Sequence, residues 1–312
     1  MTAAASTLAA LVVFTLLGYA PAVLLLPARL RPWFWVAVPV TGLAVAAVGL
    51  GWLVLVLPGG LAGELALVLA LLAAAAVTAA GHRPPRDQSF RQQAAVGALV
   101  LLTVGVALAP LVERPELISI GPNWDVEIYL PMAAYLQDAP LGLGLQHPAG
   151  FPFPGPPNPL LWRVNFFDPR WSGLTFQEVH AALDALLGLA PHASFAGLLA
   201  AMAALTPASG FLLARALRLS AAPALLATAL TALGAPVYYV VYWSFGQQAS
   251  ALPLMPLATA GLVAMLTSRD THGRMFAALG AAALFASSGF AWAGALQLSP
   301  QTDARALLVP PA

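Results

Sequence analysis

Several residue types are scarce in this 312-residue sequence or missing from it. It contains no cysteine and no lysine, and charged residues make up only 8 % of it. The absence of cysteine excludes disulfides, thiol chemistry and cysteine-bound metals. Ordinary globular proteins carry about 25 % charged residues, so the chain falls outside that class. The formal net charge of +1, from 13 basic and 12 acidic side chains, gives no general attraction for nucleic acid.

Hydrophobic residues, in contrast, make up 60 % of the chain, which excludes a disordered protein. A membrane core about 30 Å thick requires about 20 apolar residues per spanning helix. Eight stretches meet this requirement: Leu8–Leu26, Trp33–Leu57, Leu61–Ala80, Ala94–Val112, Ala193–Leu217, Ala221–Trp243, Ala249–Thr267 and Met275–Leu296. They are apolar all round, unlike the amphipathic helices of soluble proteins. The sequence therefore predicts an all-α fold, a polytopic membrane helix bundle of about eight transmembrane helices.

One long polar segment, residues 113–192, separates the first four spans from the last four. The predicted organisation is a four-span region (1–112), this long loop, a second four-span region (193–296) and a polar tail (297–312). Eight of the twelve carboxylates lie in the loop. Because a loop of that length is usually functional or disordered, and this one is rich in aromatic and aliphatic residues, we expect the chemistry of the protein there.

Arginines occur in alternate connections between the spans, those after the first, third, fifth and seventh: Arg29 and Arg31; Arg83, Arg86 and Arg91; Arg215 and Arg218; Arg269 and Arg274. The connections 58–60 and 244–248 contain none. Arginine-rich short loops stay in the cytoplasm. We therefore expect a multi-pass protein of the plasma membrane whose N-terminus, 113–192 loop and C-terminus are extracytoplasmic. The tyrosines and tryptophan of residues 238–243 are typical of an aromatic belt at the outer interface.

Two surface helices are predicted within the long loop. The first covers residues 125–137, with Asp125 as a plausible N-cap. The second begins at Thr175, because Thr175 and Glu178 have the spacing of a capping box, and it ends before Gly188. An apolar stripe along this second helix would let it lie on the membrane surface or against the bundle.

The segment Asn123 to Gln137, NWDVEIYLPMAAYLQ, is the most informative in the chain. It resembles the first outer loop of GT-C superfamily glycosyltransferases of the protein-mannosyltransferase and aminoarabinose-transferase type. In those proteins a Trp-Asp or an acidic pair precedes a Tyr, a Leu-Pro and an Ala-rich helix. The matching residues here are Trp124-Asp125, Tyr129-Leu130-Pro131, Ala133-Ala134 and Leu136-Gln137. The resemblance implies a cell-envelope enzyme that moves a sugar from a polyprenyl-phosphate donor to an extracytoplasmic acceptor.

The chain differs from that family in three ways, and one of them is that Leu130 stands where many members have a histidine after the motif tyrosine. In the family the acidic motif follows the first span, whereas four predicted spans precede it here. Family members are also longer, and residues 297–312 are polar and end in proline. We therefore expect a relative that is truncated at its C-terminus.

The position of Asp125 agrees with a catalytic role. A transferase of this kind holds a lipid phosphate at the membrane surface and needs a carboxylate that takes a proton from the incoming hydroxyl. Asp125 follows Val112 by 13 residues, so it can reach the interface, where partial desolvation makes a carboxylate a better base. We assign Asp125 as the catalytic base and Glu127 as an orienting or acceptor-binding group. The competing interpretation is that Asp125 only caps a helix and Glu127 is solvated.

Further residues are candidates for binding the substrate: Tyr129 in the motif, Arg163 and Arg170 for the lipid phosphate, and Gln247 and Gln248 for sugar hydroxyls. His180 and Asp184 stand four residues apart and could share a ligand, but without a third ligand in register we expect no metal site. No dinucleotide or phosphate-loop motif is present, so no cofactor is expected. The expected partners are a polyprenyl-phosphate-linked sugar and membrane lipid, and no nucleic acid.

A second class of function stays open at this point. The chain could be a non-catalytic or truncated multi-pass membrane protein, such as a degenerate transferase relative, a scaffold or a transporter fragment. A transporter should show charged residues in mid-membrane and a repeat between its halves. The sequence has no mid-span carboxylate and no clear repeat, so transport ranks third.

Overall fold

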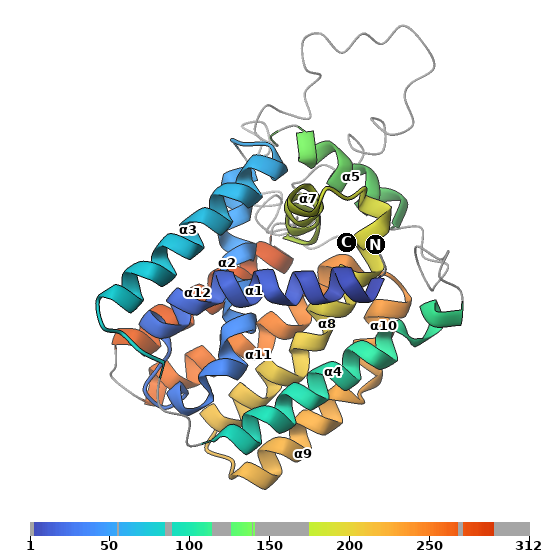
Figure 1. Ribbon diagram of the computed structural model, residues 1–312. Coiled ribbons are helices and arrows are strands. Elements are labelled where there is room, and N and C mark those ends of the chain that lie inside the picture. Colours follow the sequence, from blue (N-terminus) through green and yellow to red (C-terminus); the bar gives the residue numbers. More distant parts are fainter. Residues whose placement is uncertain are drawn as a thin grey trace, which may run out of the picture.

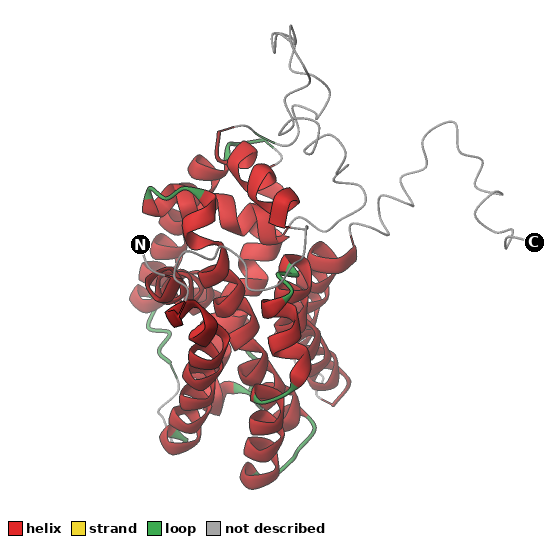
Figure 2. Cartoon of the chain, turned by 90° about the vertical axis from the view of Figure 1, so that its right-hand side faces the viewer, coloured by secondary structure: helices red, strands yellow, loops and turns green. Residues whose placement is uncertain are grey.

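The computed structural model describes residues 3–54, 56–84, 89–113, 126–138, 140, 175–267 and 271–289. Within these ranges all regular structure is helical, and short loops join the helices (Figure 2). The elements are α1 (Ala3–Leu25), η1 (Arg31–Trp33), α2 (Phe34–Val54), α3 (Gly59–Ala79), α4 (Phe90–Glu113), α5 (Val126–Asp138), α7 (Thr175–Leu187), α8 (Pro191–Ala216), α9 (Ala221–Ala232), α10 (Ala235–Tyr242), α11 (Gly246–Thr267), α12 (Thr271–Leu284) and η3 (Phe285–Gly289).

Seven helical segments of the described chain are long and apolar enough to cross a membrane. They coincide with the first seven predicted spans to within a few residues, which confirms a helical membrane bundle. The sixth span is broken into α9 and α10 at Leu233 and Gly234. Pro236, in the first turn of α10, explains the break, because proline has no N–H to continue the ladder of α9. The eighth predicted span coincides with α12 and η3 only up to Gly289 and then leaves the described residues.

The tightest contact of the bundle is the crossing of α1 and α2. Gly18 and Gly42 face each other there: a Cβ on Gly18 would lie 1.9 Å from the carbonyl oxygen of Val38, and one on Gly42 would lie 1.6 Å from that of Phe14. Glycine is therefore the only residue that lets these two backbones approach so closely, as is common where helices pack within membranes. The crossing lies in the core of the bundle, beside buried Phe14 and Leu43.

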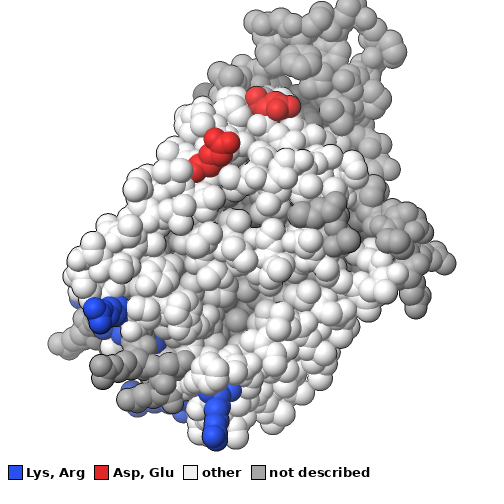
Figure 3. All heavy atoms as spheres, viewed as in Figure 1, with Lys and Arg blue, Asp and Glu red and all other residues white. Residues whose placement is uncertain are grey.

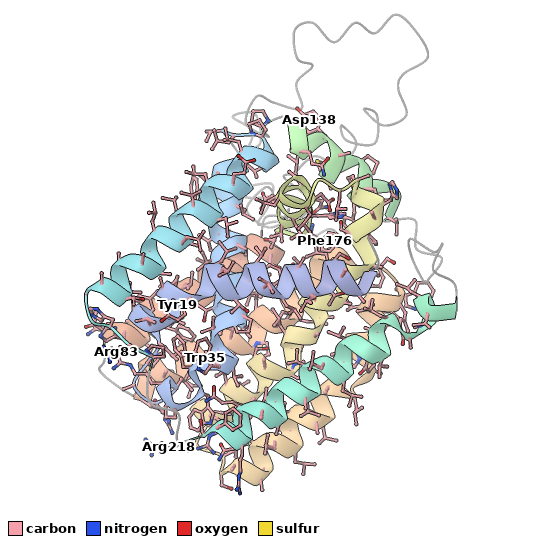
Figure 4. The ribbon with its side chains drawn as sticks, viewed as in Figure 1. Tyr19, Trp35, Arg83, Asp138, Phe176 and Arg218 are labelled. Carbon is pink, nitrogen blue, oxygen red and sulfur yellow. The ribbon has the colours of Figure 1, made fainter. Side chains whose placement is uncertain are left out.

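The two ends of the bundle carry opposite charges. Figure 3 shows acidic side chains at one end and arginines at the other, as expected from the alternation of arginines along the sequence. Figure 4 labels Arg83 and Arg218 at the arginine end and Asp138 at the opposite end. Figure 1 shows α5 and α7 gathered at that opposite end, which we call the α7 end. Both helices come from the long loop.

Exposed aromatic side chains occur near both ends. Trp35, 49 % exposed, lies at the start of α2 beside the arginine-rich loops. Tyr239 and Trp243, 53 % and 40 % exposed, lie 5.9 Å apart by ring centroids near the junction of α10 and α11. Such residues favour the boundary between lipid and water.

Candidate active site

Helix α7 is the central element of the α7 end. It ends at Leu187, and Gly188 follows with φ +63°, a left-handed conformation in which glycine is strongly preferred. The amides of Gly188 and Leu189 donate to the carbonyls of Ala185 and Asp184, which closes the helix as the sequence predicted. The predicted capping box at its start is wrong. The Thr175 hydroxyl has no hydrogen-bond partner among the described residues, and the Glu178 carboxyl points toward Gly51 of α2 instead.

Of the two positions expected for α7, on the membrane surface or against the bundle, the structure shows the second, so α7 is not a surface helix. All of its first ten residues are buried, the polar ones included. The helix packs against α2, α3, α5, α8 and α11, and Figure 1 shows it end-on between these elements. Its apolar stripe faces α1 and α2, as Val179 and Leu183 lie beside Phe14 and Leu50. The remaining faces, which should have met water or lipid headgroups, are covered by other helices.

An aromatic cluster joins α5 to α7 and α8. The Tyr129 ring of α5 lies 5.5 Å from Phe176 of α7 and 6.3 Å from Phe195 of α8. Phe176 and Phe195 meet edge to face at 5.5 Å, and His180 packs beside both rings. Such pairs contribute about 0.5–1.5 kcal/mol each beyond the area they bury. Tyr129, a predicted substrate-binding residue, is thus buried in a cluster that fixes α5 in place.

A second contact joins α7 to the start of α11. The Gln247 side-chain amide donates to the side-chain oxygen Oε1 of Gln177. Beside it, Gly246 gives room to Phe176, since a Cβ on Gly246 would lie 2.6 Å from the ring. Gln247, predicted to bind substrate, therefore contacts α7, whereas Gln248 is exposed. The sequence analysis did not identify Gln177 as a contact of Gln247. The only signal for it in the sequence was its place next to Glu178, the glutamate of the predicted capping box.

The acidic motif itself is described only in part. Asp125, Arg163 and Arg170 lie outside the described residues. Glu127 lies in the first turn of α5, although the position of its side chain is not described. Helix α5 begins at Val126, directly after Asp125, as predicted for a helix that starts at this motif. Tyr129 then ties this first turn to Phe176, and Phe176 in turn packs on Gly246.

His180, Asp184 and Ser194 form a fully buried polar cluster between α7 and α8. The Nε2 atom of His180 lies 2.8 Å from the Ser194 hydroxyl and 3.0 Å from the carbonyl oxygen of Pro191. The Ser194 hydroxyl donates to Asp184 Oδ1. Oδ2 of Asp184 is 3.1 Å from Nε2 but is not aligned for a hydrogen bond. The pair predicted to share a ligand thus binds a serine of the same chain.

This cluster differs from a Ser-His-Asp catalytic triad. In a triad the serine and the aspartate contact different nitrogens of the histidine. One ring nitrogen can then accept the serine proton while the N–H of the other donates to the aspartate. Here both contact Nε2, and Nδ1 has no partner among the described residues. Burial lowers the pKa of His180 to about 3, so the ring is neutral, and burial raises the pKa of Asp184 to about 7 against the opposing effect of the Ser194 hydrogen bond. The cluster holds α7 on α8.

Glu178 is the most perturbed carboxyl of the described chain. It is 4 % exposed, and no hydrogen-bond or ion-pair partner for it exists among the described residues. The carboxyl lies beside Gly51, where a Cβ would lie 3.3 Å from Oε2. Burial raises the pKa of Glu178 to about 8, because the charged form is poorly solvated there. Sequence reasoning gave it a capping role and so missed a carboxyl that stays protonated near neutral pH.

Neither a metal-ligand cluster among the described residues nor a known relative indicates a function for this site. Among the side chains that the structure describes, no three His, Asp or Glu residues lie together as a metal site would require. Comparisons with known protein families, curated proteins and solved structures found no match to the chain. The case for function therefore depends on the residues of the α7 end themselves.

Proposed function

We propose that the protein is a multi-pass membrane glycosyltransferase of the GT-C type. It moves a sugar from a polyprenyl-phosphate donor to an acceptor at the outer face of the plasma membrane. Asp125 takes the proton of the acceptor hydroxyl, and Glu127 orients the acceptor. Arg163 and Arg170 bind the donor phosphate, while Gln247 and Gln248 bind sugar hydroxyls near Tyr129. The α7 end then faces outward and the arginine end faces the cytoplasm.

One observation carries the proposal. Two segments about 120 residues apart in sequence, the start of α5 and the start of α11, meet on the same turn of α7. Tyr129 contacts Phe176, and Gln247 contacts the neighbouring Gln177. The start of α5, which follows the acidic motif directly in sequence, and the amide that suits a sugar therefore lie at one end of the bundle. This convergence is what a shared substrate site requires.

The reaction follows from general acid–base chemistry. Asp125 accepts the hydroxyl proton while the acceptor oxygen attacks the anomeric carbon of the sugar. The bond between that carbon and the phosphate oxygen breaks, and polyprenyl phosphate leaves with the electron pair. Near the membrane surface the base is only partly hydrated, which favours proton uptake. Positively charged side chains at the phosphate stabilise the charge that the leaving group gains.

Transfer activity of Asp125→Asn tests this function. The substitution keeps the size and helix-capping ability of the residue but removes the proton acceptor, so transfer should fall by about 10²–10⁴. Glu127→Gln should cost less, because an amide still forms hydrogen bonds. Glu64→Gln, an exposed carboxylate near the start of α3, is the matched control and should keep full activity. The assay measures transfer from a polyprenyl-phosphate sugar in membranes that contain equal amounts of each variant.

A non-catalytic membrane protein is the second candidate. The His180, Asp184 and Ser194 cluster favours it, since these polar groups bind one another and hold helices together. Wild-type protein without any transfer activity would support this candidate. Wild-type activity that Asp125→Asn retains in full would contradict the proposed mechanism but leave transfer itself in place.

A further inference from the structure

A pocket of about 420 Å³ opens at the arginine end, opposite the proposed active site. Its size falls within the range of about 300–1,000 Å³ that is typical of small-molecule sites. Four nitrogen-bearing side chains line it: Arg31, His82, Arg83 and His272. They come from three separate parts of the chain: Arg31 lies between α1 and α2, His82 and Arg83 lie between α3 and α4, and His272 lies in the first turn of α12. The pocket thus requires the folded bundle and is not a run of basic sequence.

Local structure positions each of these side chains. The α3 helix closes at Gly81, whose φ of +79° turns the chain so that His82 and Arg83 face the neighbouring loops. Nε of Arg31 donates to the carbonyl oxygen of Leu26 at 3.2 Å, which fixes the base of its guanidinium. The His272 ring contacts the carbonyl oxygen of Leu24 through Nδ1 at 2.6 Å. The side chains of Arg31 and His272 are therefore held by backbone contacts within the protein.

Positive charge at this pocket is not balanced by carboxylates of the described chain. No Asp or Glu belongs to its described lining, and neither Arg31 nor Arg83 has an ion-pair partner there. More arginines crowd the same end, since burial and the neighbouring charge of Arg218 together lower the pKa of Arg29. An anion that binds here is attracted by several guanidinium groups at once, and arginine is especially suited to phosphate oxygens.

The other wall of the pocket is apolar. Leu24, which is 41 % exposed, and Phe34 form part of this wall. Trp35, adjacent in sequence to Phe34, is an exposed aromatic residue of the kind that favours the boundary between lipid and water. A ligand with a phosphate and attached hydrocarbon satisfies both walls, whereas free phosphate satisfies only one. Basic pockets between membrane helices on the cytoplasmic side are a known mode of anionic lipid binding.

We propose that this pocket binds the phosphate of an anionic phospholipid, with Arg31 and Arg83 as the principal ligands. The lipid headgroup lies among the loops of the arginine end, and its acyl chains follow the Leu24 side of α1. This site is separate from the proposed sugar-transfer site and does not depend on it. The arginines at this end then bind a specific ligand and also determine the orientation of the chain in the membrane.

Lipid retention by the purified full-length chain tests the site. The protein is exchanged into mixed micelles of phosphatidylglycerol and phosphatidylcholine, and native mass spectrometry counts the lipids of each kind that stay bound. The double variant Arg31→Gln/Arg83→Gln should lose about tenfold or more in retained phosphatidylglycerol, since each arginine near a lipid surface contributes a several-fold effect. The matched control Arg91→Gln/Arg218→Gln removes the same charge from the same end outside the pocket lining and should stay close to wild type.

Two more variants keep the test valid if the double variant fails to fold. Arg83→Gln alone alters one exposed side chain and should give about a fivefold loss. Arg31→Lys/Arg83→Lys keeps the charge and should retain most of the binding. Equal losses in the pocket and control pairs would overturn the proposal, as would wild-type protein without preference for phosphatidylglycerol. Displacement of the lipid by equimolar inorganic phosphate would also overturn it, because the pocket would then be a site for soluble phosphate.

Discussion

The α7 end and the arginine end treat polar side chains in opposite ways. At the α7 end, Glu178, His180 and Asp184 are buried, and their pKa values shift so that the neutral forms are favoured. At the arginine end, Arg31 and Arg83 line an open pocket that has no Asp or Glu in its described lining. Ionised groups are costly to bury, so a chain keeps them at a surface or makes them neutral. The charged side chains of the arginine end therefore face the surroundings of the protein, whereas the buried polar side chains of the α7 end hold its helices together.

The two ends also differ in how deeply their contacts are buried. The α7 end is made by helices from the long loop that pack against the spans, and the contacts among His180, Asp184 and Ser194 there are fully buried. The arginine end is made by short connections and the helix ends beside them, and its contacts, such as Trp33 Nε1 donating to Gln92 and the backbone amide of Trp35 donating to Gln93, are only partly buried. Changes within the α7 end should therefore alter stability more than comparable changes at the arginine end.

The largest effect is expected at the crossing of α1 and α2, which lies between the two ends in the core of the bundle. Gly42→Ala places a Cβ into the carbonyl of Phe14, and the backbones must separate. We expect a loss of at least about 3 kcal/mol in the free energy of unfolding, more than ordinary overpacking costs. Gly49→Ala is the matched control on the same helix, with no atom within 4 Å of its Cβ. Denaturant titration in detergent compares the two; equal stability would show that the crossing is looser than described.

The next effect is a pH dependence that comes from Glu178. Its folded pKa of about 8 lies above the ordinary value of 4.5, so the folded state holds a proton that the unfolded state releases. Stability is therefore fully present below pH 4.5 and falls as the pH rises toward 8. Asp184, with a folded pKa of about 7, acts in the same direction. His180 has a folded pKa of about 3, so it is neutral in both states above pH 6.5 and adds nothing there.

Glu178→Gln isolates this contribution. The amide has nearly the same shape and no charge, so the variant should lose less stability than wild type between pH 6.5 and 9. At pH 9 it should be more stable by an amount on the order of a few kcal/mol. Thermal midpoints across this pH range measure the difference, with Glu64→Gln as the exposed control. Parallel curves for wild type and Glu178→Gln would mean that the carboxyl is not buried in the folded protein.

A smaller effect should come from Ser194→Ala. The change removes the donor to Asp184 and a partner of His180, leaving both buried without it. We expect a loss of about 1–3 kcal/mol, the usual cost of an unsatisfied buried group. Gln92→Ala at the arginine end removes the acceptor of Trp33 in a partly buried position and should cost less. If the order is reversed, the contrast between the two ends is wrong.

The sequence was sufficient for the parts of the fold that depend on uniform hydrophobicity. Seven of the eight predicted spans are found as helices long and apolar enough to cross a membrane, because about 20 consecutive apolar residues have few alternatives to a membrane helix. The break at Leu233 and Gly234 was missed, although Pro236 was a visible signal for it. The stop of α7 at Gly188 was predicted because it depends only on local backbone conformation.

The candidate site was less accessible from sequence, because its contacts are made by tertiary packing. Thr175 and Glu178 have capping-box spacing, yet the partners available to Glu178 depend on α2, 127 residues away. His180 and Asp184 were recognised as neighbours, but Ser194 belongs to the next helix and has no periodic relation to them. The contact between Gln177 and Gln247 likewise joins segments that no local pattern connects.

The accessibility of each end from outside the cell tests most directly whether the two ends lie on opposite faces of the membrane with the α7 end outward. The chain contains no native cysteine, so single cysteines can be introduced without further change. Asp138→Cys lies at the exposed end of α5, and Ser220→Cys lies in the exposed connection between α8 and α9. In intact cells, an impermeant thiol reagent should label the cysteine at 138 and leave the one at 220 unlabelled until the membrane is opened. Labelling at 220 in intact cells, with 138 protected, would contradict the orientation and the outward placement of Asp125.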